Sequence, residues 1–229
     1  MKTKWLVSFF TALALFAVGC DKDDNNPVSG GDSAIFTSLE SPYLICASRN
    51  PGGVGFDFEY DGKTGGANNM DSLTVNDFTY DIKIITTKAE KADGTLAGMP
   101  HIELSESAQA VNYSAVDTTC TGITAFENLT ASNMKAVTFK SDDASFDLSG
   151  LETGTTGKTL VSNLQTEYKK LVIGDKWKTT ANNDIADDEI VWVIKTSEGR
   201  QVKLIVTDFP ADPAPTSTGY IAVDWDFIQ

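Results

Sequence analysis

The sequence has little of what most catalytic and metal sites need. It contains one histidine and three cysteines among 229 residues, whereas zinc sites require clustered cysteine and histidine ligands. The motifs Gly-x-Ser-x-Gly, Gly-x-Gly-x-x-Gly and His-Glu-x-x-His and the P-loop are also missing from the sequence. A Ser-His-Asp triad would have to use His101, and nothing around it suggests a nucleophile. The sequence therefore predicts that the protein is not an enzyme.

Paired carboxylates leave one catalytic alternative open. Asp142-Asp143 and Asp187-Asp188-Glu189 are of the type that a glycoside hydrolase uses, since that reaction needs two carboxyl groups. In a chain with 32 acidic residues we interpret them as solvated loop residues. A hydrolase therefore ranks well below a binding protein.

Positive charge is scarce. The chain carries 18 lysine and arginine residues against 32 acidic residues, a formal net charge of −14 at pH 7. Such a surface repels the phosphates of nucleic acids and anionic lipid headgroups. We therefore expect no nucleic-acid partner.

The apolar run at the N-terminus is too short for a spanning helix. It covers 14 residues from Trp5 to Val18, whereas a spanning helix needs about 20. Two lysines precede it, as in a secretory signal peptide. The stretch Ala17-Val18-Gly19-Cys20 resembles a bacterial lipobox, although leucine is commoner than Ala17 at its position. We predict a lipoprotein signal peptide over residues 1–19 and acylation of Cys20; the alternative is an ordinary signal peptide that happens to end near a cysteine.

Residues 20–34 are acidic, contain Pro, Gly and Ser, and lack apolar periodicity. This composition predicts a flexible tether after the acylated cysteine. The triplet Lys22-Asp23-Asp24 resembles the tag that sends some Gram-negative lipoproteins to the outer face of the outer membrane. We therefore expect an outer-membrane lipoprotein, exposed at the cell surface and held only by its lipid, with residues 35–229 as one domain.

Most of this domain has the apolar alternation of β-strands. In Ile190–Phe209, two alternating runs flank Ser197-Glu198-Gly199, which predicts a β-hairpin. Glycines and Asn/Asp clusters separate further segments of β character. The segments are Ser41–Ala47, Val54–Tyr60, Phe78–Thr87, Ile102–Leu104, Met134–Lys140, Ala144–Leu148, Leu171–Ile173, Ile190–Thr196, Gln201–Thr207 and Gly219–Ile228.

Two segments favour short helices. Leu160, Leu164 and Tyr168 recur at i, i+4 and i+8 within Thr159–Lys170, and Asn128–Met134 is a shorter candidate. The predicted fold class is all-β, a single domain of antiparallel strands and hairpins with one or two short helices.

Two cysteines remain after Cys20 is acylated. A protein outside the cytoplasm can keep a disulfide, so Cys46 and Cys120 either form one or stay as two buried free thiols. The sequence alone leaves both alternatives open, because it does not give the distance between the two residues.

The C-terminal 40 residues resemble the end of the HmuY family. That family has an apolar strand, a Gly-containing turn, a strand with a central lysine and a final strand that opens with glycine and carries aromatics. The matching residues here are Val191-Trp192-Val193-Ile194-Lys195, Gly199, Lys203-Leu204, Thr207-Asp208-Phe209, Gly219 and Trp225. The strand Asp77–Thr86 and Trp177 add a looser similarity.

The resemblance implies a fold and a function. HmuY-like proteins are haem-binding lipoproteins on the surface of Gram-negative bacteria. This chain would then capture haem from haemoproteins and pass it to a TonB-dependent outer-membrane receptor. Haem would lie in a flat apolar cleft with histidine or methionine as axial ligand. Haem iron is the only metal that we expect.

The iron ligands are where this chain departs from the family. Some members use two histidines, one of them shortly after a tryptophan equivalent to Trp177, but no His or Met follows Trp177 here. The candidates are Met134, at the start of a predicted strand, and Met99 and His101, at the end of a Gly-rich loop that could cover a haem face. Met70 is the last choice.

Each candidate also has a structural alternative. Methionine commonly fills gaps in a core, and a lone histidine can lie on an exposed loop. Aromatic side chains that could stack on a porphyrin are more often core residues. Those side chains are Tyr80, Tyr168, Trp177 and Trp192.

A second hypothesis keeps the fold and changes the ligand. The same β-rich surface lipoprotein would bind a glycan or a protein and no haem. The position of the candidate ligands separates the two hypotheses, because haem binding requires Met99, His101 or Met134 to face an apolar cleft.

Overall fold

The structure is a computed structural model that describes residues 43–47, 53–59, 70–72, 80–90, 96–149, 151, 157–177, 190–209 and 220–229. The predicted signal peptide, Cys20 and the tether lie outside these residues. No helix in the described ranges is long and apolar enough to span a membrane.

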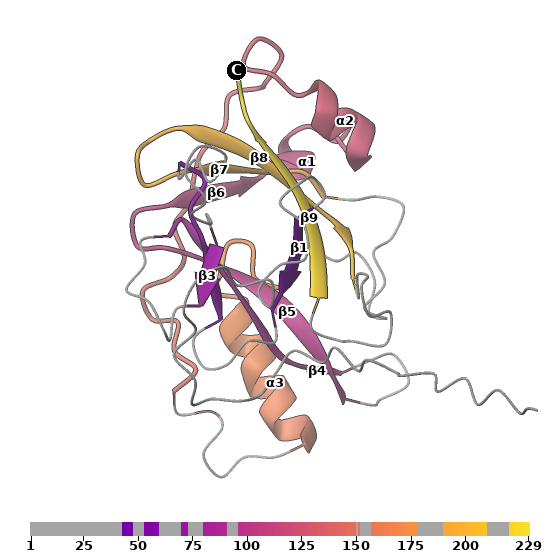
Figure 1. Cartoon of the computed structure of the whole chain (residues 1–229). Helices are drawn as coiled ribbons and strands as arrows, with labels where there is room; N and C mark the ends of the chain where they lie inside the picture. The colour runs from indigo at the N-terminus through magenta and orange to yellow at the C-terminus, as the bar shows by residue number, and fades with distance from the viewer. Residues whose placement is uncertain are drawn as a thin grey trace, which may run out of the picture.

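The larger sheet has five antiparallel strands in the order β1-β9-β8-β7-β6 (Figure 1). Its strands are β1 (Tyr43–Cys46), β6 (Gln109–Asn112), β7 (Trp192–Lys195), β8 (Gln201–Asp208) and β9 (Tyr220–Phe227). The β7–β8 hairpin turns at Gly199, where φ is 90°, a conformation that favours glycine. The hairpin predicted from the alternating pattern is confirmed.

The smaller sheet has four antiparallel strands in the order β3-β2-β4-β5. Its strands are β2 (Val54–Phe56), β3 (Met70–Ser72), β4 (Ile82–Glu90) and β5 (Leu96–Leu104). The long β4–β5 pair continues from Ile82–Leu104 to Glu90–Leu96. Together the two sheets confirm the predicted all-β fold as a single domain.

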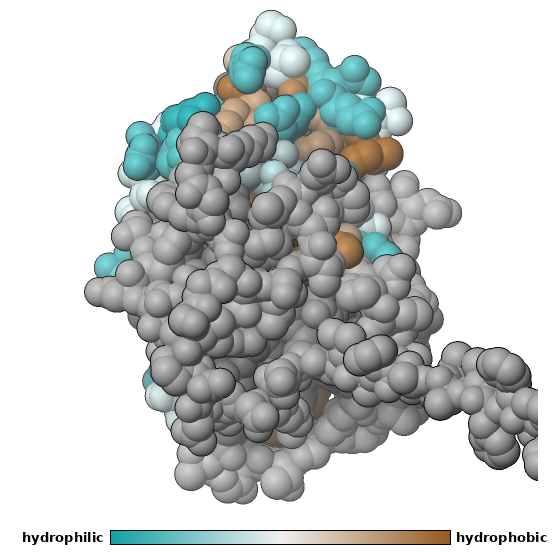
Figure 2. Space-filling view, in the orientation of Figure 1, coloured by the Kyte–Doolittle hydropathy of each residue, from teal (hydrophilic) through white to brown (hydrophobic). Residues whose placement is uncertain are grey.

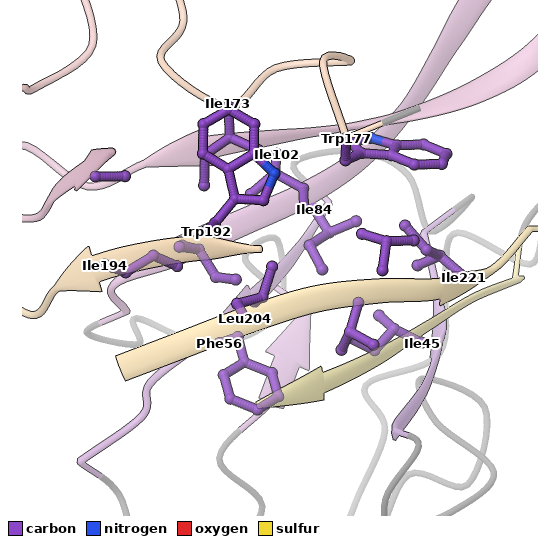
Figure 3. Packing of buried hydrophobic residues seen from close by; sticks show 14 of the residues in the cluster. Ile45, Phe56, Ile84, Ile102, Ile173, Trp177, Trp192, Ile194, Leu204 and Ile221 are labelled. Atoms are coloured by element: carbon purple, nitrogen blue, oxygen red, sulfur yellow. The ribbon is translucent and has the colours of Figure 1, made fainter. Parts of the chain in front are cut away.

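The main core lies between the two sheets. Alternate residues of β8, Val202, Leu204 and Val206, join side chains from β1, β2, β4 and β5 in this core. Figure 3 shows Leu204, Phe56, Ile84 and the two buried tryptophans within it. Side chains alternate along a strand, so the remaining side chains of β8 point to the opposite face of the larger sheet. Both faces of β8 are buried.

The described residues include three helices that pack on the sheets. They are α1 (Tyr113–Val116), α2 (Gly122–Asn128) and α3 (Gly157–Tyr168). α2 packs against β8, on the opposite face from the main core, and α3 packs against β4 and β5. The two helices therefore lie toward opposite ends of the molecule (Figure 1).

The helix predicted at Thr159–Lys170 is confirmed as α3, with Leu160, Leu164 and Tyr168 all buried on one face. The helix predicted at Asn128–Met134 is wrong. Asn128 is the last residue of α2, and its side-chain amide donates to the carbonyl of Thr124.

Three predicted strands, Met134–Lys140, Ala144–Leu148 and Leu171–Ile173, are also wrong. Only the bridge between Ala110 and Lys140 links the first segment to a strand. Val137 and Phe139 alternate because they pack against the cluster around Tyr113, so their period of two reflects burial and not a strand ladder.

A candidate functional site with a lysine rim

Met134 lies in the turn region that follows α2. Its backbone N–H donates to Thr130 O at 3.0 Å, and its half-buried side chain packs against the cluster that contains Tyr113, Cys120 and Phe126. The next residue, Lys135, donates its N–H to the Tyr113 hydroxyl at 2.8 Å. Met134 thus packs as a gap-filling core residue beside α2.

Met99 and His101 lie in the middle of β5, so their predicted place in a Gly-rich loop is wrong. β5 is an edge strand, and an edge tolerates Pro100 because its missing N–H leaves no ladder bond unmade. Met99 pairs with Thr87 on β4, and its side chain is outside the described set. His101 has a relative exposure of 0% and therefore forms no solvent-facing lid.

His101 belongs to a buried polar group beneath α3. Its Nε2 lies 2.7 Å from Glu103 Oε1, and Lys83 Nζ lies 2.5 Å from Glu103 Oε2. The imidazole ring stacks on Tyr168, with ring centroids 4.7 Å apart. Burial raises the pKa of Glu103, but the His101 bond and the Lys83 charge outweigh it and hold that pKa below its ordinary value.

The described ligand candidates therefore do not converge. His101 lies between the smaller sheet and α3, whereas Met134 lies beside α2 on the far face of the larger sheet. Met70 is in β3, and its side chain is outside the described set. Of the aromatic candidates, Trp177 is buried and donates to Pro100 O at 3.2 Å. Tyr80 is half-buried.

Cys120 is a free, buried cysteine, so the disulfide alternative with Cys46 is not formed. Cys46 pairs with Tyr220 at the β1 edge of the larger sheet, whereas Cys120 packs beside Val191 and Val193 near β7. Three strand spacings separate β1 from β7, roughly 14 Å, or about twice the Cα–Cα distance of a disulfide. Burial raises the pKa of the Cys120 thiol.

The carboxylate pair Asp142-Asp143 binds backbone. Asp142 accepts the N–H of Leu104 at 2.7 Å and of Val172 at 2.6 Å, and Asp143 accepts the N–H of Ser145 at 2.8 Å. Residues 187–189 are outside the described ranges. Within those ranges, no cluster of three or more His, Cys, Asp or Glu side chains could hold a metal.

A groove of about 690 Å³ lies between β6, α1 and the chain that follows α3. This volume is within the range of about 300–1,000 Å³ that small-molecule sites occupy. Half of its lining is apolar, from Ala110, Val111, Ala115, Val116, Leu171, Val172 and Trp192. The rest is polar, from Asn112, Lys140, Ser141, Asp143, Lys169, Lys170 and Lys176.

Two structural features bring the distant segments of the groove together. Ala110 in β6 exchanges two backbone hydrogen bonds with Lys140, at 2.8 and 3.0 Å. Asp142 holds Val172, and with it the turn that follows α3, against Leu104 in β5. The lysines from positions 140 and 169–176 therefore line one groove.

The four lysines have different partners. Lys170 Nζ lies 2.8 Å from both carboxylate oxygens of Glu167 and 3.0 Å from Ser145 O. Lys176 donates to the carbonyls of Leu171 and Val172. Lys140 and Lys169 form no salt bridge with any described residue.

The groove also keeps like charges close. Burial lowers the pKa of Lys176, the nearby carboxylates of Asp175 and Asp142 raise it, and the positive charge of Lys140 lowers it further. One lining carboxylate, Asp143, faces four lining lysines. Three further carboxylates lie beside these lysines, because Glu167 bonds Lys170 and both Asp142 and Asp175 are close to Lys176. Four carboxylates thus accompany the four lysines, and the groove carries no clear excess of positive charge.

Trp192 is the aromatic residue of the groove lining, but its ring is buried beneath the groove. It is 1% exposed, and its indole N–H has no hydrogen-bond partner in the described part of the chain. Its ring lies beside Ile173 and Ile102 in the main core (Figure 3). Of the tryptophans and tyrosines that the sequence suggested as porphyrin contacts, Trp192 is the one that lines the groove.

Apolar surface also appears near the groove. In the space-filling view, apolar patches lie among hydrophilic side chains at the end of the molecule that carries α1 and α2 (Figure 2). Val116 in α1 and Ile123 in α2 are 39% and 37% exposed. Val116 also lines the groove, so apolar surface continues out of it.

Comparisons with known proteins add no relative. No family model matches the chain, and neither a curated protein nor a solved structure matches it.

Proposed function

We propose that this protein is a surface-anchored lipoprotein that binds haem and passes it to an outer-membrane receptor. The observation that carries the proposal is the groove, in which the exposed or half-buried apolar side chains of Ala115, Val116 and Val172 lie beside four lysines. The C-terminal resemblance to the HmuY family and the predicted acylation of Cys20 support the same role.

Haem chemistry suits the groove. Haem is a flat, mostly apolar macrocycle with two propionate groups. Apolar and aromatic side chains can cover its faces, and lysine ammonium groups can form charge-assisted hydrogen bonds to its propionates. The groove supplies both kinds of contact on an otherwise acidic protein.

Binding is favoured over catalysis because the titratable groups are used structurally. Asp142 and Asp143 accept backbone N–H groups, and Glu103 bonds His101 and Lys83. A catalytic acid or base needs access to a substrate atom within hydrogen-bond reach.

A second candidate function rests on the positions of His101 and Met134. Neither side chain lines the groove, so haem bound there would lack the iron ligands suggested from the sequence. The same groove on a surface lipoprotein would then serve a glycan or a protein.

A haemin titration tests the proposal. The mature chain, with Cys20→Ser to remove the lipid, is titrated with haemin and followed by Soret absorbance and tryptophan fluorescence. We expect a saturable one-to-one change and transfer of the bound haem to excess apomyoglobin. No saturable change at micromolar haemin would overturn haem binding and favour a glycan or a protein ligand.

A further inference from the structure

The chain that follows α3 lies along the outer edge of β5. β5 pairs with β4 and is the last strand of the smaller sheet, so its other edge has no neighbouring strand in that sheet. Gly174 donates its N–H to Ile102 O at 2.9 Å, and Ile102 donates its N–H to Gly174 O at 3.0 Å. These bonds form an antiparallel bridge of one residue pair. We call Leu171–Trp177 the edge strap.

Two further contacts cover the edge of β5 on either side of this bridge. Pro100 has no N–H, and its carbonyl accepts the indole N–H of Trp177 at 3.2 Å. Leu104 donates its N–H to one oxygen of Asp142, and the other oxygen accepts the N–H of Val172 in the strap. Every second residue of an antiparallel edge strand points its backbone groups outward. The chain therefore bonds each outward N–H of β5 from Pro100 to Leu104.

Buried side chains hold the strap in this position. Ile173 and Trp177 are buried in the main core, and Leu171 is buried in the cluster beneath α3. Gly174 has φ of 55°, and a Cβ atom there would lie 3.1 Å from Tyr168 O. Glycine thus lets the backbone turn and present both its N–H and its carbonyl to β5. The strap is fixed to the edge by core packing.

An uncovered strand edge can pair with a strand of another molecule, because its N–H and C=O groups have no partners. A second copy of this chain presents the same groups on its own β5, so the contact can be symmetric. Pro100 protects the middle of β5, since proline cannot donate to a ladder. Ile102–Leu104 has no proline, and this is the stretch that the strap and Asp142 cover.

We propose that the edge strap prevents the protein from pairing with a second copy of itself through β5. When the strap is displaced, Ile102 and Leu104 lose their backbone partners, and β5 of the second copy replaces them. This role does not depend on the ligand of the groove and goes beyond the proposed function.

A substitution that loosens the strap tests the proposal. In Gly174→Ala, the positive φ strains the alanine, and its Cβ atom approaches Tyr168 O. The mature Cys20→Ser chain with this change is studied by native-state hydrogen exchange and by sedimentation velocity. We expect the amides of Ile102 and Leu104 to exchange at least about tenfold faster. We also expect dimers at concentrations at which the unchanged chain forms none, with renewed protection of both amides in the dimer.

Two further variants control for strain and for loss of the fold. Gly199→Ala also places alanine at a positive φ, but in the β7–β8 hairpin of the larger sheet, and should change neither measurement. Trp177→Phe keeps an aromatic ring in the core and removes only the N–H that bonds Pro100 O. It should act in the same direction as Gly174→Ala, less strongly, and it tests the proposal if Gly174→Ala does not fold.

Three results would overturn the proposal. If the two amides exchange faster but the strap variants associate no more than the unchanged chain does, the β5 edge needs no cover. If exchange at Ile102 and Leu104 is not accelerated in either strap variant, the strap does not protect the edge. If Gly199→Ala forms dimers to the same extent, association follows from general destabilisation and not from β5.

Discussion

Asp142 shows how a single side chain can position the groove. Its two oxygens accept N–H groups from Leu104 and Val172, which belong to different segments. Burial raises the pKa of Asp142, while these two bonds oppose the rise. The carboxylate thus fixes the turn after α3 against β5, and Leu171 and Val172 take their places in the groove.

Asp142→Ala should therefore destabilise the fold. Two partly buried N–H groups would lose their acceptors, and we expect a loss of roughly 2–4 kcal/mol in the free energy of unfolding. Urea denaturation measures this loss. Asp143→Ala is the control, because Asp143 is exposed and accepts one local bond from Ser145; equal losses in the two variants would contradict a bridging role for Asp142.

Glu103 predicts a dependence of stability on pH. Its pKa is lowered in the folded state, since the His101 bond and the Lys83 charge outweigh burial. A carboxyl group with a lowered pKa stabilises the fold above its unfolded pKa of about 4.3, and this contribution is lost as the pH falls through the folded pKa. Acid should therefore weaken the interactions of Glu103 with His101 and Lys83 beneath α3.

The test compares Glu103→Gln with the unchanged chain by urea denaturation at neutral pH and at about pH 3.5. The unchanged chain should lose more stability on acidification than the variant does. Glu106→Gln, at an exposed position, should follow the unchanged chain. Parallel losses in all three proteins would show that Glu103 contributes nothing to the pH dependence.

At the scale of elements, the approach of β2 to β4 depends on a glycine. Gly53 has φ of 81°, and a Cβ atom there would lie 2.7 Å from Ile84 O and 2.9 Å from Ile85 Cβ. Gly199, in the β7–β8 hairpin, has φ of 90° and nothing within 4 Å of its Cβ position. Alanine would be strained by the positive φ at both positions, but only at Gly53 would its Cβ atom also clash with β4.

Gly199→Ala should cost about 1–2 kcal/mol, the usual strain of a left-handed residue. Gly53→Ala should cost clearly more, because the β4 backbone must also move. Thermal and urea denaturation of both variants measure the difference. If the two variants lost the same free energy of unfolding, the close contact between Gly53 and β4 would make no contribution to stability.

The elements that follow a local pattern were predictable from the sequence. The alternation in β8 and the four-residue spacing in α3 reflect which side chains each element buries. β5 was misread because Gly98 and Pro100 are typical of loops, although an edge strand accepts both. β6 was missed because Gln109–Asn112 is short and buries only Ala110 fully.

The groove could not be predicted in the same way. Its lysines come from two regions about 30 residues apart, and they meet only through the Ala110–Lys140 bridge and the turn after α3. No periodicity in the local sequence indicates that these lysines lie close together in the fold. The sequence suggests Trp192 as a possible contact, but it gives no sign that Trp192 and these lysines line the same groove.

At the scale of the whole molecule, the N-terminal sequence predicts how the β domain reaches the cell surface. Acylation at Cys20 should provide the membrane attachment, because Ala17-Val18-Gly19-Cys20 resembles a lipobox and follows an apolar run typical of a signal peptide. Stable anchoring by lipid requires more than one acyl chain, which a lipobox cysteine carries after processing.

Cys20→Ser should therefore move the protein from the membrane fraction to the soluble fraction and abolish incorporation of labelled palmitate. Alanine replacement of Lys22-Asp23-Asp24 is the matched variant for export. It should stay acylated and membrane-bound, while protection from protease added to whole cells shows that it no longer reaches the outer face. If the Cys20→Ser protein stayed in the membrane fraction, attachment would depend on the protein itself, and the lipoprotein prediction would be wrong.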